Sequence, residues 1–317
     1  MNTIWLVGTG GVGTEYAKVL DSLKINYIAI GRGEESVQKF ETASGHAAIK
    51  GGFEKYISSN PKIPTHAIIS VGVEELSSTA TALINAGIKN ILLEKPGICE
   101  PREIKELVKI AHEKGANVVL AYNRRFYASV LKAEEIISDD LGVTSFNFEF
   151  TEWAHKIEPM ANDSGKFRRW FLANSTHVAD LAFFLGGKPE KISAFHIGGL
   201  SWHPDASVFS GAGISKKGAL FSYQANWEAP GRWVVEICTH KHRLYFKPME
   251  SLQIQELGSV AVNPVIIDDH LDKEFKPGFY LQTKAFLNGE MSRFCTLEEQ
   301  KEMIEKYYVE MSGYNIA

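Results

Sequence analysis

The chain has 317 residues, which suits two domains of ordinary size better than one. Its 44% hydrophobic and 23% charged residues are typical of a globular protein, and no apolar stretch approaches the roughly 20 residues that cross a bilayer. With 34 basic and 38 acidic residues, the net charge of −4 gives no overall attraction for nucleic acid. We therefore expect neither a membrane nor a nucleic acid as partner.

The first residues and the cysteines bear on location. The segment MNTIWLVGTGGVG is apolar but lacks a basic leader and a small-residue cleavage site, so it is typical of a first strand. Cys99, Cys238 and Cys295 lie far apart in the sequence, which fits neither a disulfide framework nor paired zinc ligands. We expect a cytoplasmic protein.

Short apolar runs alternate with helical stretches over residues 1–122. The strand-like runs are TIWLV (3–7), NYIAI (26–30), HAIIS (66–70), NILLE (90–94) and NVVLAY (117–122). Segments between them, such as Val73–Ala86 and Pro101–Lys114, carry apolar residues at helical spacing. With right-handed crossovers, this pattern predicts a doubly wound parallel sheet of the Rossmann type as the N-terminal domain.

The pattern changes over residues 123–317. A helix is expected over Phe126–Ser138, and Phe146, Phe148 and Phe150 then recur at every second position, as in a strand with one apolar face. Similar strands follow at 192–199, 219–227, 232–240 and 243–257, interrupted by one helix over Asn174–Leu185. We predict a C-terminal α+β domain with a large, mainly antiparallel open sheet, and a helical tail over Tyr280–Met311 that packs back on the body.

A glycine loop follows the first predicted strand directly. It consists of Gly8, Thr9, Gly10, Gly11, Val12 and Gly13, and a helical pattern comes next. Gly8 suits the tight turn, Gly10 lets the backbone approach a pyrophosphate, and Gly13 lets helix and strand pack closely. The alternative is an ordinary glycine turn, whereas a mononucleotide P-loop would need a Lys-Ser or Lys-Thr pair that is missing. Between strand and helix, the loop predicts a dinucleotide site.

The end of the second strand bears on the choice of dinucleotide. It reads Gly31-Arg32-Gly33 and offers no carboxylate to the ribose hydroxyls, while Glu34 and Glu35 come late and suit the start of the next helix. Arg32 suits a 2′-phosphate, or else it is a solvated loop residue. We predict that NADP(H) is preferred, with NAD(H) left open.

Three further segments carry a family resemblance. Glu94-Lys95-Pro96 stands at the end of the strand NILLE, Tyr122-Asn123-Arg124-Arg125-Phe126 lies at the junction, and residues 174–180 read NSTHVAD. Together with the glycine loop and GFYLQTKAFLNGE (278–290), they resemble the Gfo/Idh/MocA oxidoreductases over nearly the whole chain. The resemblance implies an NAD(P)-dependent dehydrogenase or reductase. It would transfer hydride between nicotinamide and a hydroxyl or carbonyl carbon of a sugar-like substrate, such as a sugar acid or nucleotide sugar, and would form a homodimer or homotetramer.

Lys95 is the first catalytic candidate. Ligands of such sheets bind outside the carboxyl ends of the strands, and Pro96 keeps the chain at Lys95 extended. A lysine there can hydrogen-bond the substrate oxygen and exchange its proton as hydride leaves or arrives. The alternative interpretation is that Lys95 is a solvated residue at a strand end with no catalytic role. The resemblance permits Glu94, Lys95 and Pro96 to contact the cofactor, with Glu94 orienting the loop or the nicotinamide ribose.

His177 is the second catalytic candidate, because the resemblance places a proton-handling group there and histidine titrates near neutral pH. Asp180 lies three residues on and either orients His177 or packs and caps. Many family members carry an aspartate four residues before this histidine, but Ala173 stands here with Asn174 beside it. Lys95 must then carry more of the acid–base work, or the reaction differs.

Other residues complete the expected substrate site. Besides Lys95 and His177, the candidates are Tyr122, Arg124, Arg169, Trp170 and Asn174. Arg169 and Trp170 belong to a basic segment with Lys166 and Arg168 that suits an anionic group on the substrate or is a solvated turn. His240 and His242 share a strand face without a third ligand, so we expect no metal.

Two other functions stay open at this point. One is a hydrolase or lyase that uses tightly held NAD for a transient oxidation. The missing family aspartate at position 173 leaves this function open. The other is a non-enzymatic dinucleotide-binding regulator, against which the intact Glu94-Lys95-Pro96 sequence argues. Both would use the same fold, because fold alone does not decide function.

Overall fold

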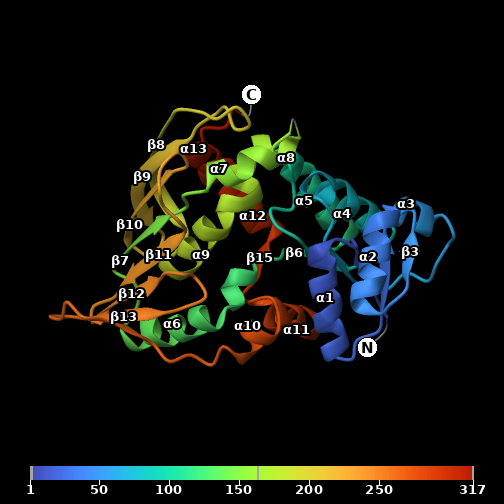
Figure 1. The fold of residues 1–317 in the computed structure, drawn as a ribbon, viewed down its shortest axis with the longest axis horizontal. Helices are drawn as coiled ribbons and strands as arrows, with labels where there is room; N and C mark the ends of the chain where they lie inside the picture. The colour runs from blue at the N-terminus through green and yellow to red at the C-terminus, as the bar shows by residue number, and fades with distance from the viewer. Residues whose placement is uncertain (1–2, 163, 316–317) are drawn as a thin grey trace. The chain divides into compact units, whose positions relative to one another are not determined.

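The computed structural model describes residues 3–162 and 164–315, which form two compact units (Figure 1). Unit 1 runs from the N-terminal strand to Asn123 and includes Lys273–Lys301. Unit 2 comprises Arg124–Asp272 and the chain from Glu302 onward. The tail therefore contributes to both units.

The sheet of unit 1 has the order β15-β6-β5-β4-β1-β2-β3 in the described residues. Its parallel strands are β1 (Ile4–Val7), β2 (Tyr27–Gly31), β3 (Ala48–Lys50), β4 (His66–Ile69), β5 (Asn90–Leu93) and β6 (Asn117–Leu120). The short β15 (Cys295–Thr296) pairs antiparallel with β6. The chain builds outward from β1 to β3 and then from β4 to β6, which confirms the predicted doubly wound sheet. β3 and β15 were not predicted.

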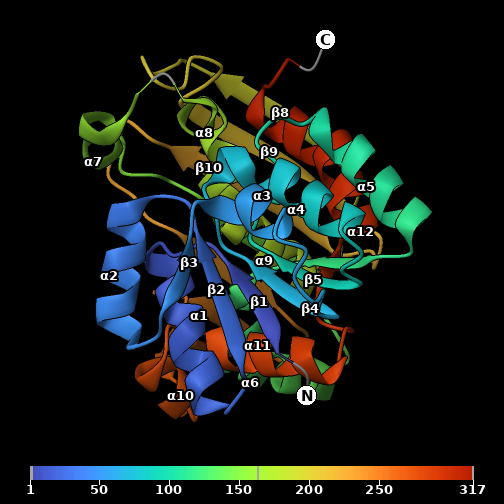
Figure 2. The same cartoon turned by 90° about the vertical axis from the view of Figure 1, so that its right-hand side faces the viewer.

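Helices of unit 1 connect these strands. They are α1 (Gly11–Ser22), α2 (Glu34–Ser44), α3 (Gly52–Ile57), the 3-10 turn η1 (Val73–Glu75), α4 (Leu76–Asn85), α5 (Glu103–Lys114) and α11 (Phe279–Asn288). α1 packs against α2 and α11, and α4 packs against α5, as Figure 2 also shows for α4 and α5. The apolar side of α1 is buried at Tyr16, Ala17, Val19 and Leu20, as the helical spacing predicts.

The sheet of unit 2 has the order β14-β13-β12-β11-β7-β10-β9-β8. Its strands are β7 (Ser145–Glu149), β8 (Pro189–Ile197), β9 (Val208–Ser215), β10 (Leu220–Asn226), β11 (Val234–Cys238), β12 (His242–Phe246), β13 (Gln253–Glu256) and β14 (Val262–Pro264). All neighbours pair antiparallel except β7 and β10, so the predicted mainly antiparallel sheet is confirmed. The predicted strand at 243–257 is two strands, because Pro248 cannot donate to a ladder.

Unit 2 also contains a series of helical segments, of which α9 packs on the sheet. They are the turn η2 (Asn123–Phe126), α6 (Ala128–Asp139), α7 (Ala154–Ile157), η3 (Glu158–Met160), α8 (Gly165–Arg168), the π-helical turn η4 (Phe171–Ser175) and α9 (Thr176–Gly186). The expected helix at 174–185 is thus the end of η4 and most of α9. α9 packs on β7 and β11, with the Phe183 ring edge-on to Phe146 and Phe148.

The tail is helical with one interruption. After α10 (His270–Glu274) and α11 come β15, α12 (Leu297–Met303), the π-helical turn η5 (Ile304–Tyr308) and α13 (Val309–Ser312). Among the helices formed by residues 3–162 and 164–315, none combines the length and the apolar character that a membrane crossing requires.

Candidate functional site

The glycine loop of unit 1 leaves open space over the start of α1. A Cβ on Gly8, whose φ is +116°, would lie 2.6 Å from the Ser70 carbonyl carbon, and one on Gly13 would lie 2.0 Å from the Gly8 oxygen. Substituents on Gly10 and Gly11 would meet nothing within 4 Å. Gly8 and Gly13 are therefore needed for close packing, and the other two leave room for a ligand.

The start of α1 suits an anion. Gly10 is the N-cap and contributes no side chain, and the first turn carries no acidic residue. Backbone N–H groups at a helix start carry partial positive charge and point outward along the axis, so this loop fits the pyrophosphate of a dinucleotide. The side chain of Thr9 is buried and its hydroxyl lies 3.2 Å from that of Ser36, while Val12 is half-buried in the first turn.

Arg32 follows β2 and is paired with a residue that the sequence analysis missed. Its guanidinium forms an ion pair with Glu75, the last residue of η1, and both line a cavity of about 110 Å³ together with Gly8 and Gly52. Glu34 lies 3.6 Å from Lys50 and Glu35 lies 2.6 Å from Lys39, in the first turn of α2 as expected. Two carboxylates do line this cavity, but they come from Glu54 in α3 and from Glu75 in the turn that follows β4, rather than from the end of β2.

Glu94 is turned toward α1. Its carboxylate accepts a hydrogen bond from the Tyr16 hydroxyl at 2.8 Å, and that hydroxyl also lies 3.3 Å from Gln282. Burial raises the pKa of the Glu94 carboxyl, against the opposing influence of the Lys95 charge. This arrangement favours orientation of the loop over a direct contact with a ribose.

Lys95 is half-buried at the carboxyl end of β5, in a loop that the Gln300 side chain holds through a hydrogen bond. The Pro96 carbonyl accepts a hydrogen bond from Gln300 at 3.0 Å, and the Gln300 amide also bonds the Tyr122 hydroxyl at 3.1 Å. Tyr122 is 1% exposed, so in unit 1 it braces the loop rather than facing solvent. Gln300 was not singled out in the sequence, because it lies about two hundred residues from Pro96.

In unit 2, a buried carboxylate takes the hydrogen bonds of Asn174 and Ser175. The Asn174 amide nitrogen lies 3.0 and 3.1 Å from the two Glu152 oxygens, and the Ser175 hydroxyl donates at 2.8 Å. Glu152 is 2% exposed, and burial raises its pKa against these donors. Both donors lie in the π-helical turn η4, a feature often found at functional sites.

His177 lies half-buried in the first turn of α9, with its ring centroid 6.2 Å from that of Trp233. The Trp233 ring lies between two cations: Arg124 is 4.8 Å and Arg232 is 4.5 Å from its centroid. Arg232 also lies 3.8 Å from Glu152, and burial lowers the pKa of Arg124. This part of unit 2 combines a buried acid, two guanidinium groups and a flat aromatic surface, which together suit a polar ligand.

The remaining candidates are engaged within unit 2. Asp180 accepts two hydrogen bonds from Arg125, at 2.9 Å from Nε and 2.6 Å from Nη2. Arg169 pairs with Asp205 at 3.3 Å, and the Trp170 ring stacks on Phe167 at 5.4 Å. These contacts give the side chains structural roles, and a contact of Arg169 and Trp170 with a substrate stays a prediction.

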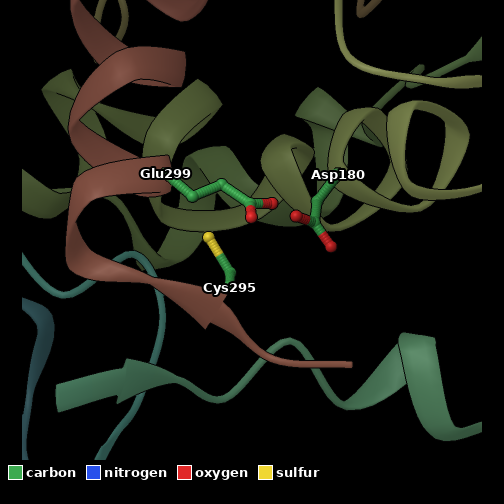
Figure 3. Close-up of side chains that lie close together, drawn as sticks. All are labelled: Asp180, Cys295 and Glu299. Atoms are coloured by element: carbon green, nitrogen blue, oxygen red, sulfur yellow. The ribbon is translucent and has the colours of Figure 1, made fainter. Parts of the chain in front are cut away.

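Cys295 and Glu299 bring two potential ligand atoms within 4.8 Å of each other in unit 1 (Figure 3). The same figure draws Asp180, which belongs to unit 2 and is bound by Arg125. His242 lies 2.6 Å from Asp140, while His240 is exposed. The expectation that the protein binds no metal stays a prediction.

A doubly wound sheet with this glycine loop is the architecture of a dinucleotide-binding domain, and here an α+β unit with an open sheet follows it. Residues 3–122 match the model of the oxidoreductase family with an NAD-binding Rossmann fold, Gfo/Idh/MocA. The predicted resemblance is confirmed over the N-terminal part of the chain, where residues 3–122 form the NAD-binding Rossmann domain of the Gfo/Idh/MocA oxidoreductases. A comparison with curated protein sequences gives no match.

Solved structures share the fold along the whole chain. UDP-N-acetylglucosamine 3-dehydrogenase from Acidithiobacillus ferrooxidans is 13% identical, with a TM-score of 0.74 over 98% of this chain and 97% of that one. An Agrobacterium radiobacter oxidoreductase in complex with NAD+, L-tartaric acid and magnesium is 13% identical, with a TM-score of 0.76 over 98% and 96%. Levoglucosan dehydrogenase in complex with NADH is 16% identical, with a TM-score of 0.78 over 98% and 96%.

Proposed function

We propose that the protein is an NADP(H)-preferring dehydrogenase or reductase that acts on a hydroxyl or carbonyl carbon of a sugar-like substrate. The observation that carries the proposal is the position of Lys95. It follows β5, next to β4 and two strands from the glycine loop after β1, at the sheet edge where such folds bind ligands. The similar structures that act on a nucleotide sugar or on levoglucosan support the substrate class.

A bound nicotinamide supplies the hydride acceptor or donor, and the protein handles the proton. The Lys95 amine hydrogen-bonds the reacting oxygen and takes or returns its proton, with His177 as the second proton-handling group. Because the Asn174 amide nitrogen is held by Glu152, its side-chain oxygen is left to accept a hydrogen bond from a substrate hydroxyl. Arg124 completes the polar groups offered to the substrate.

The preference for NADP(H) is supported by Arg32 at the end of β2. A guanidinium there suits a 2′-phosphate through paired charge-assisted hydrogen bonds. Two of the similar structures hold NAD+ or NADH, so use of NAD(H) is part of the same proposal.

The test is a fluorescence titration with NADPH and NADH, followed by turnover assays on a panel of sugars, polyols and nucleotide sugars. Lys95→Ala should keep dinucleotide binding and lose turnover about a hundredfold or more. Lys89→Ala is the matched control, because Lys89 precedes β5 as Lys95 follows it, and its amine bonds the Lys114 carbonyl. Absence of binding by the unaltered protein, or full turnover by Lys95→Ala, would refute the proposal.

Product release without a net absorbance change, in protein that copurifies with its dinucleotide, would instead indicate the non-redox enzyme. Full biological activity of Lys95→Ala would favour a regulator. We also assign the protein to the cytoplasm, which the wide spacing of its three cysteines along the sequence supports.

We further propose a homodimer or homotetramer. Phe195 and Ile197 on β8 and Leu220 on β10 expose 69%, 70% and 63% of their surface, on strands of the open sheet. Large exposed apolar side chains on the strands of an open sheet are typical of contact surfaces. Light scattering should give a multiple of 35.3 kDa that falls for Phe195→Asp but not for Leu257→Asp, a matched change at an exposed turn. A monomeric unaltered protein would refute it.

A further inference from the structure

We propose that Glu75 sets the balance between NADPH and NADH, by acting as the ribose carboxylate and as a competitor for Arg32. The inference rests on the proposed function and deepens it. Arg32 follows β2 and Glu75 lies in the turn that follows β4, and both strands pair in parallel with β1, one on each side. Their carboxyl ends lie at one edge of the sheet, and the Arg32–Glu75 ion pair spans the end of β1 there.

Both side chains face one cavity. Arg32, Glu75 and Glu54 line the same space of about 110 Å³ as Gly8, the first glycine of the dinucleotide loop. A ligand held at the glycine loop therefore has one cation and two carboxylates beside it. The charge of this lining disfavours a further anion unless one carboxylate moves away.

The ion pair is open to competition. Arg32 exposes 73% and Glu75 35% of its side chain, so water and salt screen their attraction. A 2′-phosphate carries more charge than a carboxylate and three acceptor oxygens, so it is the stronger partner for a guanidinium. NADPH would take Arg32 from Glu75 and leave the Glu75 carboxylate as a like charge near the phosphate.

With NADH the same carboxylate becomes favourable. An unphosphorylated ribose presents two hydroxyl donors, and a carboxylate is an acceptor-only group. Glu75 thus supplies the carboxylate for the ribose hydroxyls that the end of β2 lacks, while the ion pair between Arg32 and Glu75 is kept. One residue raises the affinity for NADH and lowers that for NADPH.

The experiment is a fluorescence titration of purified full-length protein with NADPH and NADH at fixed, low ionic strength. Glu75→Gln keeps the size and removes the charge. We expect NADPH to bind about threefold more tightly, since a screened like charge is gone. NADH should bind about fivefold more weakly, since an amide is a poorer partner for the ribose diol. The ratio of the two Kd values should shift on the order of tenfold.

Glu74→Gln is the matched control: it makes the same charge change one residue away, at an exposed side chain outside the cavity lining. It should leave the Kd ratio within about twofold of the unaltered protein. An unchanged ratio in Glu75→Gln, or an equal shift in both variants, would overturn the inference while leaving the proposed function in place. Failure of the unaltered protein to bind either dinucleotide would overturn the proposed function itself.

Discussion

The ion pair between Arg125 and Asp180 gives a sharp test of what holds unit 2 together. Both side chains are almost fully buried, at 5% and 4% exposure, and the carboxylate accepts two hydrogen bonds from the guanidinium. Asp180→Ala removes both bonds and leaves a cation buried next to the Phe184 ring, 4.8 Å away. Breaking a buried pair from one side costs about 3–5 kcal/mol, because the remaining charge loses its bidentate partner.

This magnitude is easily measured. For a domain of this size, a loss of about 4 kcal/mol lowers the midpoint of thermal unfolding by roughly 8–16 °C. Urea denaturation gives the free energy of unfolding directly. Glu135→Ala is the control, because Glu135 pairs with Lys132 at 2.7 Å on the exposed side of α6 and should contribute less than about 1 kcal/mol.

The double variant Arg125→Met, Asp180→Leu distinguishes the net contribution of the ion pair to stability from the cost of leaving one of its charges buried alone. Replacing both charges by apolar groups of similar size is often neutral, so it should recover most of the stability lost in Asp180→Ala. A single variant that loses less than about 1 kcal/mol would refute this reasoning. So would a double variant no more stable than Asp180→Ala.

Three further predictions follow from the site. Gly13→Ala should weaken NADPH binding by roughly tenfold or more in titrations, because its Cβ would clash with the loop backbone, whereas Gly11→Ala should not disturb the fold. The raised pKa of Glu152 means that the folded state binds more protons than the unfolded state, so stability should fall as pH rises through the folded pKa; urea denaturation at several pH values should show this slope, and Glu152→Gln should lack it. Tyr122→Phe should cost about 1 kcal/mol and lower kcat more than dinucleotide affinity, because it frees Gln300 behind the Lys95 loop; an unchanged kcat would contradict that role.

Local patterns predicted most of unit 1 and much of unit 2. NILLE and the alternating phenylalanines of β7 can be predicted as strands from the local sequence alone, because their periodicity and composition are typical of strands. β9 was missed because it reads VFSGAGIS. A Cβ on Gly211 would lie 2.4 Å from the Tyr223 ring, and one on Gly213 would lie 2.5 Å from the Phe221 ring. The rings on the neighbouring strand β10 leave room only for glycine at these two positions. In a sequence considered alone, a glycine within an apolar run indicates a turn or a bulge instead.

Short edge strands were missed for a related reason. β3 is three residues and β15 is two residues long, so neither has enough length to show a period. β15 exists only because the chain returns to unit 1 near Lys273 and pairs beside β6. Such a pairing is a long-range event that no local window contains.

The same distinction applies to the site. The glycine loop and Lys95 were recognised because their chemistry is tied to one strand end. Glu75 was missed because its meaning depends on Arg32, forty-three residues earlier, and on the order in which β2, β1 and β4 lie. The sequence shows a carboxylate missing from the end of β2, but only the sheet order shows where another one is supplied.

Glu152 is an intermediate case, because the sequence predicts that its side chain is buried but does not predict its hydrogen-bond donors. Phe146, Phe148 and Phe150 point to the buried face of the sheet, and the next residue of that parity is Glu152. An alternation that continues into a carboxylate predicts a buried acid, and a buried acid requires donors. What the sequence does not contain is their identity: a π-helical turn brings Asn174 and Ser175, rather than Ala173, to the carboxylate. The absence of an aspartate at position 173 therefore does not leave this part of unit 2 without an acid, since the strand provides one from the other side.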